Sequence, residues 1–356
     1  QDMSVKNLLI CQPVVRTKAN AGALIGAVTP GTDSRGTIKL PTVEIKKVQV
    51  EYPQVQAEQT SASAGALIGT FEGGSLTVQD VLAENHFRDK LGSSTEKAAD
   101  LKLEEESKYR IRALKGTAGG LIGTAKGKIS LTDSAAALYV EGMYAGGLVG
   151  TAEKAAAAAA ASGSTVQIQS CYVGGHTANK KFDISQKPGN GANANTAFEN
   201  LTGRYNVAAY TGGFAGGLAA QLPADSQIAN TYVSASVYSP TAEEKSDETE
   251  GGSGTAADET EDPAMKAPAF VAFYDYASRT NGILPSETSG TGTNKKSVYP
   301  GCYVCSKVNE KYVLAYDEAL ASLFGVKDPN ADSSEEENKD AEEKRNTCLL
   351  YTSDAA

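Results

Sequence analysis

The chain has 356 residues, of which 40% are hydrophobic and only 7% aromatic, and it has no Trp. A core of such small side chains favours a thin, layered architecture of stacked short strands over a deep globule. The formal net charge of −10 argues against nucleic acid as a partner, because phosphate binding needs clustered Lys and Arg. No segment approaches the ~20 apolar residues of a membrane helix, so we predict no membrane span in this sequence.

A glycine-flanked hexapeptide recurs along the first two thirds of the chain. It reads Ala-Gly-Ala-Leu-Ile-Gly at 21–26 and 64–69, Ala-Gly-Gly-Leu-Ile-Gly at 118–123, Ala-Gly-Gly-Leu-Val-Gly at 145–150 and Thr-Gly-Gly-Phe-Ala-Gly at 211–216. Such self-similarity predicts a repeat architecture in which each unit buries its apolar face against the next. The spacing between copies is irregular, which a solenoid tolerates because insertions project sideways as loops.

The composition of the hexapeptide indicates how a unit packs. Its two central apolar residues form a step that can be buried, and the flanking glycines permit a positive φ and close backbone approach at the corners of a coil. Strands of successive coils would lie ~4.8 Å apart and hydrogen-bond to one another. The structural repeat positions assigned on this basis are Gly22, Leu24, Gly26, Gly65, Leu67, Gly69, Gly119, Leu121, Gly123, Gly146, Leu148, Gly150, Gly212, Phe214 and Gly216.

A second recurrent element ends in Tyr-Val and follows a short β-like run each time. It lies at 137–140, 170–173, 230–233 and 301–304. Alternation along a strand places Tyr and Val on opposite faces, so we expect inward Val residues and a row of exposed tyrosines. This surface row consists of Tyr139, Tyr172, Tyr232 and Tyr303. Two interpretations stay open: a stabilising ladder, or an aromatic stripe that binds sugars or a host protein. Residues 267–273 lie where a sixth, degraded hexapeptide is expected.

Together the two elements resemble the GLUG repeat, whose signature is Gly-Gly-Leu-Val-Gly preceded by an Asn-x-Tyr-Ala/Val-type strand. The resemblance covers about residues 5–310, and it is weaker at 21–69, where Ala23 and Ala66 replace the second Gly. It implies an all-β fold, a β-solenoid similar to a parallel β-helix, built from degenerate Gly-Gly-Leu-Val-Gly repeats with loop and short-helix insertions. The family occurs in large bacterial surface proteins, including adhesins and some secreted peptidases, and it implies no catalytic residue here.

The predicted organisation is a repeat region at 1–310 followed by non-repetitive sequence. Charged, Ala-rich or acidic stretches predict insertions at 71–110, 151–163, 176–210 and 238–265. Residues 311–330 would be the end of the solenoid or a short helix, and 331–347 a charged, disordered linker. Residues 348–356 read, codon by codon, as a translated sequencing adapter and are excluded from the fold. With Gln instead of Met at position 1, this suggests a metagenomic fragment of a longer bacterial protein.

Few residues are candidates for chemistry. Cys302 and Cys305 form a C-x-x-C, but a structural zinc site needs four ligands and no second pair exists. Cys302 also occupies the repeat slot of Cys171, which indicates a small, half-polar residue in a stacked ladder. His86 and His176 are the only histidines, and neither lies in a recognisable triad or metalloprotease motif. We therefore expect no catalytic, cofactor-binding or metal-binding residue.

These patterns predict a non-enzymatic bacterial surface or secreted repeat protein that acts as an adhesin or structural stalk. Its partner would be a host or bacterial surface glycan or protein, contacted through the insertions. Two alternatives stay open. A β-helical carbohydrate-active enzyme would need at least two carboxylates converging in a groove, and a pilin-like filament subunit would need a hydrophobic helical N-terminus.

Overall fold

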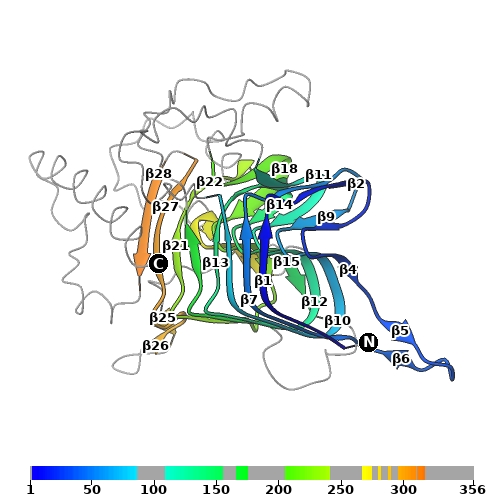
Figure 1. Cartoon of the computed structure of the whole chain (residues 1–356). Coiled ribbons are helices and arrows are strands. Elements are labelled where there is room, and N and C mark those ends of the chain that lie inside the picture. The colour runs from blue at the N-terminus through cyan, green and yellow to red at the C-terminus, as the bar shows by residue number, and fades with distance from the viewer. Residues whose placement is uncertain are drawn as a thin grey trace, which may run out of the picture.

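The computed structural model describes residues 2–85, 109–154, 166–174, 205–240, 267–274, 280–281, 288–289, 296–309 and 311–316. Within these ranges the chain is almost entirely β, and most of its strands join one 24-stranded sheet. Nearly all pairings are parallel, and the sheet curls around a shared interior (Figure 1). This arrangement is compatible with the expected β-solenoid.

The strands follow one another in layers, and each layer pairs in parallel with the next. The first layer is β1 (Met3–Cys11), β2 (Val14–Thr17), β3 (Ala21–Gly22) and β4 (Ile25–Val28). The second is β7 (Thr42–Glu51), β8 (Gln54–Ala57), β9 (Ser63–Gly65) and the start of β10 (Ile68–Glu84). The third comprises the rest of β10, β11 (Arg110–Gly119) and the start of β12 (Ile122–Thr132).

The later layers repeat this plan. The fourth is the rest of β12, β13 (Ala135–Ala137), β14 (Tyr139–Gly146) and β15 (Val149–Glu153). The fifth is β16 (Val166–Gln169), β17 (Tyr172–Gly174), β18 (Val207–Gly216) and β19 (Ala219–Leu222). The sixth is β20 (Gln227–Ala229), β21 (Tyr232–Ser234), β22 (Ser236–Tyr238), the 3-10 turn η3 (Ala267–Ala269) and β23 (Val271–Tyr274).

The last strands finish the sheet differently. β27 (Tyr303–Val308) pairs in parallel with β21 and β22, and β28 (Lys311–Tyr316) then runs antiparallel along β27. The beginning of the segment 311–330 is therefore a strand at the end of the sheet and not a helix. The short strands outside the layers are β5 (Gly31–Thr32), β6 (Ile38–Lys39), β24 (Thr280–Asn281), β25 (Thr288–Ser289) and β26 (Lys296–Ser297).

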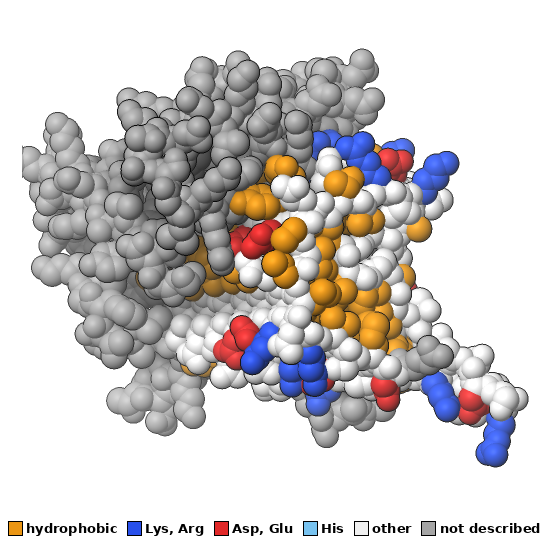
Figure 2. All heavy atoms as spheres, in the orientation of Figure 1, with side chains coloured by type: hydrophobic (Ala, Val, Ile, Leu, Met, Phe, Trp, Pro, Cys, Tyr) orange, Lys and Arg blue, Asp and Glu red, His pale blue; other side chains and the backbone are white. Residues whose placement is uncertain are grey.

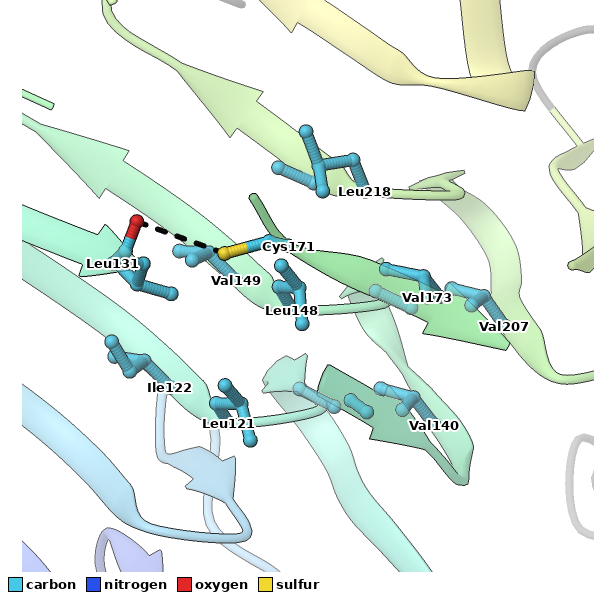
Figure 3. Packing of buried hydrophobic residues seen from close by; sticks show 14 of the residues in the cluster. Leu121, Ile122, Leu131, Val140, Leu148, Val149, Cys171, Val173, Val207 and Leu218 are labelled. Carbon is cyan, nitrogen blue, oxygen red and sulfur yellow. Dashed lines mark hydrogen bonds between the residues drawn. The ribbon is translucent and has the colours of Figure 1, made fainter. Parts of the chain in front are cut away.

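The hexapeptides stack directly on one another. A backbone hydrogen bond runs from the N–H of each central apolar residue to the carbonyl of its counterpart in the next layer, with N···O distances of 2.8–3.2 Å. This column consists of Leu24, Leu67, Leu121, Leu148, Leu218 and Phe270. Figure 3 shows three of these leucines one above another in the core. From Leu67 onward the column is fully buried, and each side chain contributes about 2 kcal/mol of hydrophobic stabilisation.

The register corrects our alignment of the fifth hexapeptide. Gly146, the second residue of the fourth copy, pairs with Gly216, and Val149 pairs with Ala219. The fifth copy is therefore Ala-Gly-Gly-Leu-Ala-Ala at 215–220 and not the segment at 211–216. The expected alignment was wrong because the true copy ends in Ala, whereas Thr-Gly-Gly-Phe-Ala-Gly keeps the glycine spacing by coincidence.

Two assigned repeat residues consequently lie outside the repeat. Gly212 is exposed, has a φ of +80° and would have no atom within 4 Å of an added Cβ. Phe214 pairs with Tyr144 in register, and their rings are 4.7 Å apart. Both residues belong to the preceding part of β18, and Gly216 keeps a repeat role as the second residue of its copy.

The motif glycines allow the backbones of neighbouring segments to approach closely. The positive φ that we expected is wrong: no glycine of the hexapeptides, as the structure aligns them, has one. A Cβ on Gly119 would overlap the carbonyl oxygen of Ile122, three residues further on in the same turn. A Cβ on Gly123 would lie 2.5 Å from the carbonyl oxygen of Gly69 and 2.7 Å from that of Ala64, in the layer before. The first glycine of a copy thus permits a tight turn, and the last permits layers to stack.

Strands extend into all four predicted insertions. β10 continues through residues 71–84, β15 covers 151–153, β18 begins before 210 and β22 ends at 238. These ends belong to the sheet, so each insertion is shorter than the sequence indicated. Residues 86–108, 155–163, 176–204 and 241–265 of the insertions, and the segments 317–330, 331–347 and 348–356, lie outside the described residues.

Candidate functional site

Three of the four predicted tyrosines form a stacked column. The rings of Tyr172 and Tyr232 are 5.4 Å apart and inclined by 7°, and those of Tyr232 and Tyr303 are 5.1 Å apart and inclined by 20°. All three side chains are half-buried. Because the rings turn their faces toward one another, the inner faces are not open to a sugar, which favours the ladder interpretation.

Tyr139 does not belong to this column. Ala135 holds the place above Tyr172, whereas Tyr139 lies on the next strand opposite Arg110 and is only 4% exposed. The expectation for Tyr139 is wrong because Ala-Leu-Tyr-Val enters β14, while the other Tyr-Val pairs lie on strands that stack below β13.

A second column of small polar residues lines the corner before these tyrosines. Each member donates to the carbonyl two residues earlier: Ser134 Oγ to Thr132 at 2.7 Å, Cys171 Sγ to Gln169 at 3.3 Å and Thr231 Oγ1 to Ala229 at 3.0 Å. The residue before each has a φ of about +50°. A short side chain at this corner therefore gives a backbone carbonyl of the turn a hydrogen-bond donor.

Cys302 continues the corner column, as the repeat alignment predicts. It is fully buried, and its Sγ lies 3.8 Å from the carbonyl oxygen of Pro300. Thr231 lies between Cys171 and Cys302 in the stack and keeps the two sulfurs apart. Burial raises the pKa of the Cys171 thiol from 9.0 to about 12, so this thiol is a poor nucleophile.

A charged cluster on the outer face of β11, β14 and β18 was not expected from the sequence. Glu141 is 1% exposed. Its carboxylate lies 3.3 Å from the Nε of Arg112, 3.7 Å from an Nη of Arg110 and 3.4 Å from the hydroxyl of Tyr210. Arg112 Nε also donates to the Tyr210 hydroxyl at 3.0 Å. The four side chains therefore join three successive layers.

The electrostatics of this cluster favour a structural role for its side chains over a catalytic one. Burial, followed by the charge of Glu141, raises the pKa of the Tyr210 phenol, so its hydroxyl stays protonated. Burial lowers the pKa of Arg110, and the charge of Glu141 opposes this shift. Glycoside hydrolysis uses two carboxylates, one of them as an acid, whereas this cluster holds one carboxylate beside two guanidinium groups. Its chemistry is that of an ion-pair network.

An aromatic cluster continues the same outer face. Tyr205 and Tyr210 are buried there, packed with Met143 and Tyr238, and the rings of Tyr205 and Tyr238 are 5.3 Å apart. The sequence signal for this face was the alternation Arg-Ile-Arg in β11, which places both arginines on one side of a strand. Their partner Glu141 could not be found without the register.

The described part of the chain holds no group of three or more His, Cys, Asp or Glu arranged to bind a metal ion. His86 and His176, and the side chain of Cys305, lie outside what the structure describes. No helix in the described ranges has the length and hydrophobicity to cross a membrane. No family model, no curated protein and no solved structure matches this chain.

Proposed function

We propose that this chain is a β-solenoid of GLUG-like repeats that serves outside a bacterial cell as an adhesin or structural stalk, without enzymatic activity. One observation carries the proposal. The described strands on either side of residues 86–108 and of residues 175–204 end and resume at the same corner of two different layers. Contacts contributed by both segments would thus come from one side of the stack.

The register places this corner. Glu84 pairs with Ala137, which occupies the position of Gly174 in the fifth layer. The chain re-enters at Ile111 and at Val207, which both pair with Val140. A rigid stack that presents variable segments at one place is a common way of positioning binding residues. The ion-pair network of Glu141 lies directly beside the re-entry points.

The alternative hypothesis, a carbohydrate-active enzyme, is tested by an activity assay. The chain is incubated with a panel of neutral and uronate-containing polysaccharides, and both reducing ends and unsaturated products are measured. We expect no turnover. Turnover that is lost in a Glu141→Gln variant would replace the proposal with an enzyme whose site is the Glu141 cluster.

Binding is tested with the same chain on arrays of surface glycans and on immobilised bacterial and host cells. We expect binding that survives Lys154→Ser, a change on the described surface away from the shared corner, and that is lost when residues 178–200 are replaced by Gly and Ser of equal number. Binding that is indifferent to this replacement, or absent altogether, would contradict an adhesive role for the corner.

A further inference from the structure

The two ends of the layered sheet are finished differently. β1, β2, β3 and β4 each pair with the second layer, at β7, β8, β9 and β10, and within the described residues their other edges carry no strand. At the opposite end, β28 runs antiparallel along β27 and covers its edge. Proteins cover, bend or charge an edge to prevent another strand from pairing with it. Among the described residues, the pairing thus turns antiparallel at the β28 end, whereas at the β1–β4 end every strand is parallel and has one neighbouring layer.

Core residues of the first layer lie at the β1–β4 end. Their partners in the second layer are 0–2% exposed, whereas the first-layer residues are only partly buried or are exposed. The pairs are Met3 with Val43, Val5 with Ile45, Leu8 with Val48, Ile10 with Val50, Val15 with Val55, and Ile25 with Ile68.

Two further apolar side chains of the first layer, Leu9 and Val14, pair with Gln49 and Gln54 on the outward side of the strands and are 56% and 65% exposed. Figure 2 shows hydrophobic side chains gathered beside the projecting hairpin β5–β6. This hairpin carries Ile38, which is 67% exposed. The end of the sheet therefore has the composition of an interior contact between layers and not that of a polar cap.

The charge of this end differs from that of the chain. The segment 2–41 has five basic and two acidic side chains, whereas the whole chain has 33 basic and 43 acidic ones. Neighbouring layers meet through pairs of opposite charge: Glu44 of the second layer contacts Lys6 of the first at 2.8 Å, and Lys126 contacts Glu153 at 3.3 Å. Carboxylates in a layer placed against β1 would complement this basic charge.

We propose that the end formed by β1–β4 is an acceptor surface for one more acidic β-layer of the same repeat type, stacked in parallel. Its apolar step would continue the leucine column above Leu24, and its carboxylates would face Lys6 and Arg16. A second copy of this chain fits less well, because two such ends carry like charge and the last parallel strand, β27, is already paired with the antiparallel β28. The inference rests on the layered fold and not on the proposed surface role.

The test adds such a layer to the full chain. A copy of residues 42–74 replaces Gln1, so that Asp2 follows the copy as Ser75 follows Gly74. The register permits this because Met3 and Leu76 both pair with Val43. One control carries the copied residues in scrambled order. A second control has lysine in the copy at the positions of Glu44, Glu51 and Glu58.

Hydrogen exchange of the backbone amides in β1 and β2 gives the readout. We expect exchange at least about tenfold slower with the acidic copy than with the scrambled one, and a smaller protection with the lysine copy. Equal exchange with the acidic and scrambled copies overturns the acceptor surface, and equal protection by the acidic and lysine copies overturns its preference for acidic layers.

Sedimentation of the unextended chain tests the rival occupant. Self-association that protects β1 would show that a second copy covers this end, and it would overturn the proposal. A second extension, copied from residues 128–154 and joined by a short Gly-Ser linker, repeats the comparison with a different layer. Failure of both extensions to protect β1 counts against the acceptor surface.

Discussion

Replacing Gly123 by Ala tests whether the last glycine of a hexapeptide sets the spacing between layers. The added Cβ would lie 2.5 Å from the carbonyl oxygen of Gly69, and 2.7 Å and 2.9 Å from the carbonyl oxygen and the nitrogen of Ala64. Ordinary contacts need about 3.5 Å, so the two layers must separate by nearly 1 Å at this point. All three atoms belong to the backbone and cannot rotate away.

Overpacking of this kind costs about 1–3 kcal/mol, and each backbone hydrogen bond that lengthens across the gap loses up to about 1 kcal/mol. We expect Gly123→Ala to lower the free energy of unfolding by about 3 kcal/mol, measured by urea denaturation followed by circular dichroism. Gly31→Ala is the matched control, because an added Cβ there meets nothing within 4 Å. Equal stability of the two variants would refute close approach as the reason for the motif glycine.

Three further predictions concern the columns and the charged cluster. Tyr232→Ala should destabilise the chain by about 1 kcal/mol more than Tyr172→Ala in urea denaturation, because the middle ring stacks on both sides; equal losses would contradict the stack. Because burial raises the folded pKa of Cys171 from 9.0 to about 12, its contribution to stability should be complete below pH 9 and fall between pH 9 and 12 by up to about 1.4 kcal/mol per pH unit. Cys171→Thr, which places at this corner the residue type that Thr231 supplies in the next layer, should remove that fall in thermal melts across this range, and an unchanged pH profile would contradict it. Glu141→Ala should cost about 3 kcal/mol in urea denaturation because it leaves the Arg112 guanidinium buried without its carboxylate; a loss below about 1 kcal/mol would mean that the pair is not effectively buried.

The first four hexapeptides could be aligned from the sequence because each of them keeps the glycines and apolar residues of the motif at the same local spacing. Gly65, Gly119 and Gly146 fall in register at the positions that the repeat predicts. The fifth copy could not be aligned, because two consecutive alanines, Ala219 and Ala220, replace the Val-Gly that marks the fourth copy. Where small apolar residues substitute for one another, only the backbone register decides which glycine stacks on which.

The Glu141 cluster could not be predicted from the sequence, for a different reason. Glu141 and Arg112 are opposite each other in register, but Glu141 and Tyr210 are 69 residues apart in the sequence. Which residues meet across layers depends on how many residues each insertion removes from the stack. The sequence shows where insertions occur, but it does not locate the first and last residue of each insertion to better than a few residues. An error of one residue turns an outward side chain inward.

The columns explain how the layers keep their register despite these unequal insertions. At the corner, a backbone turn with positive φ is followed by a short donor such as Ser134, Cys171 or Thr231, and this turn fixes where the next strand starts. At the hexapeptide, a glycine without room for a Cβ fixes how closely the layers approach. A slipped layer would place a side chain against backbone at one site and leave a buried donor unpaired at the other. Both errors are costly, so the chain between these two anchors can vary in length and charge while the stack stays aligned.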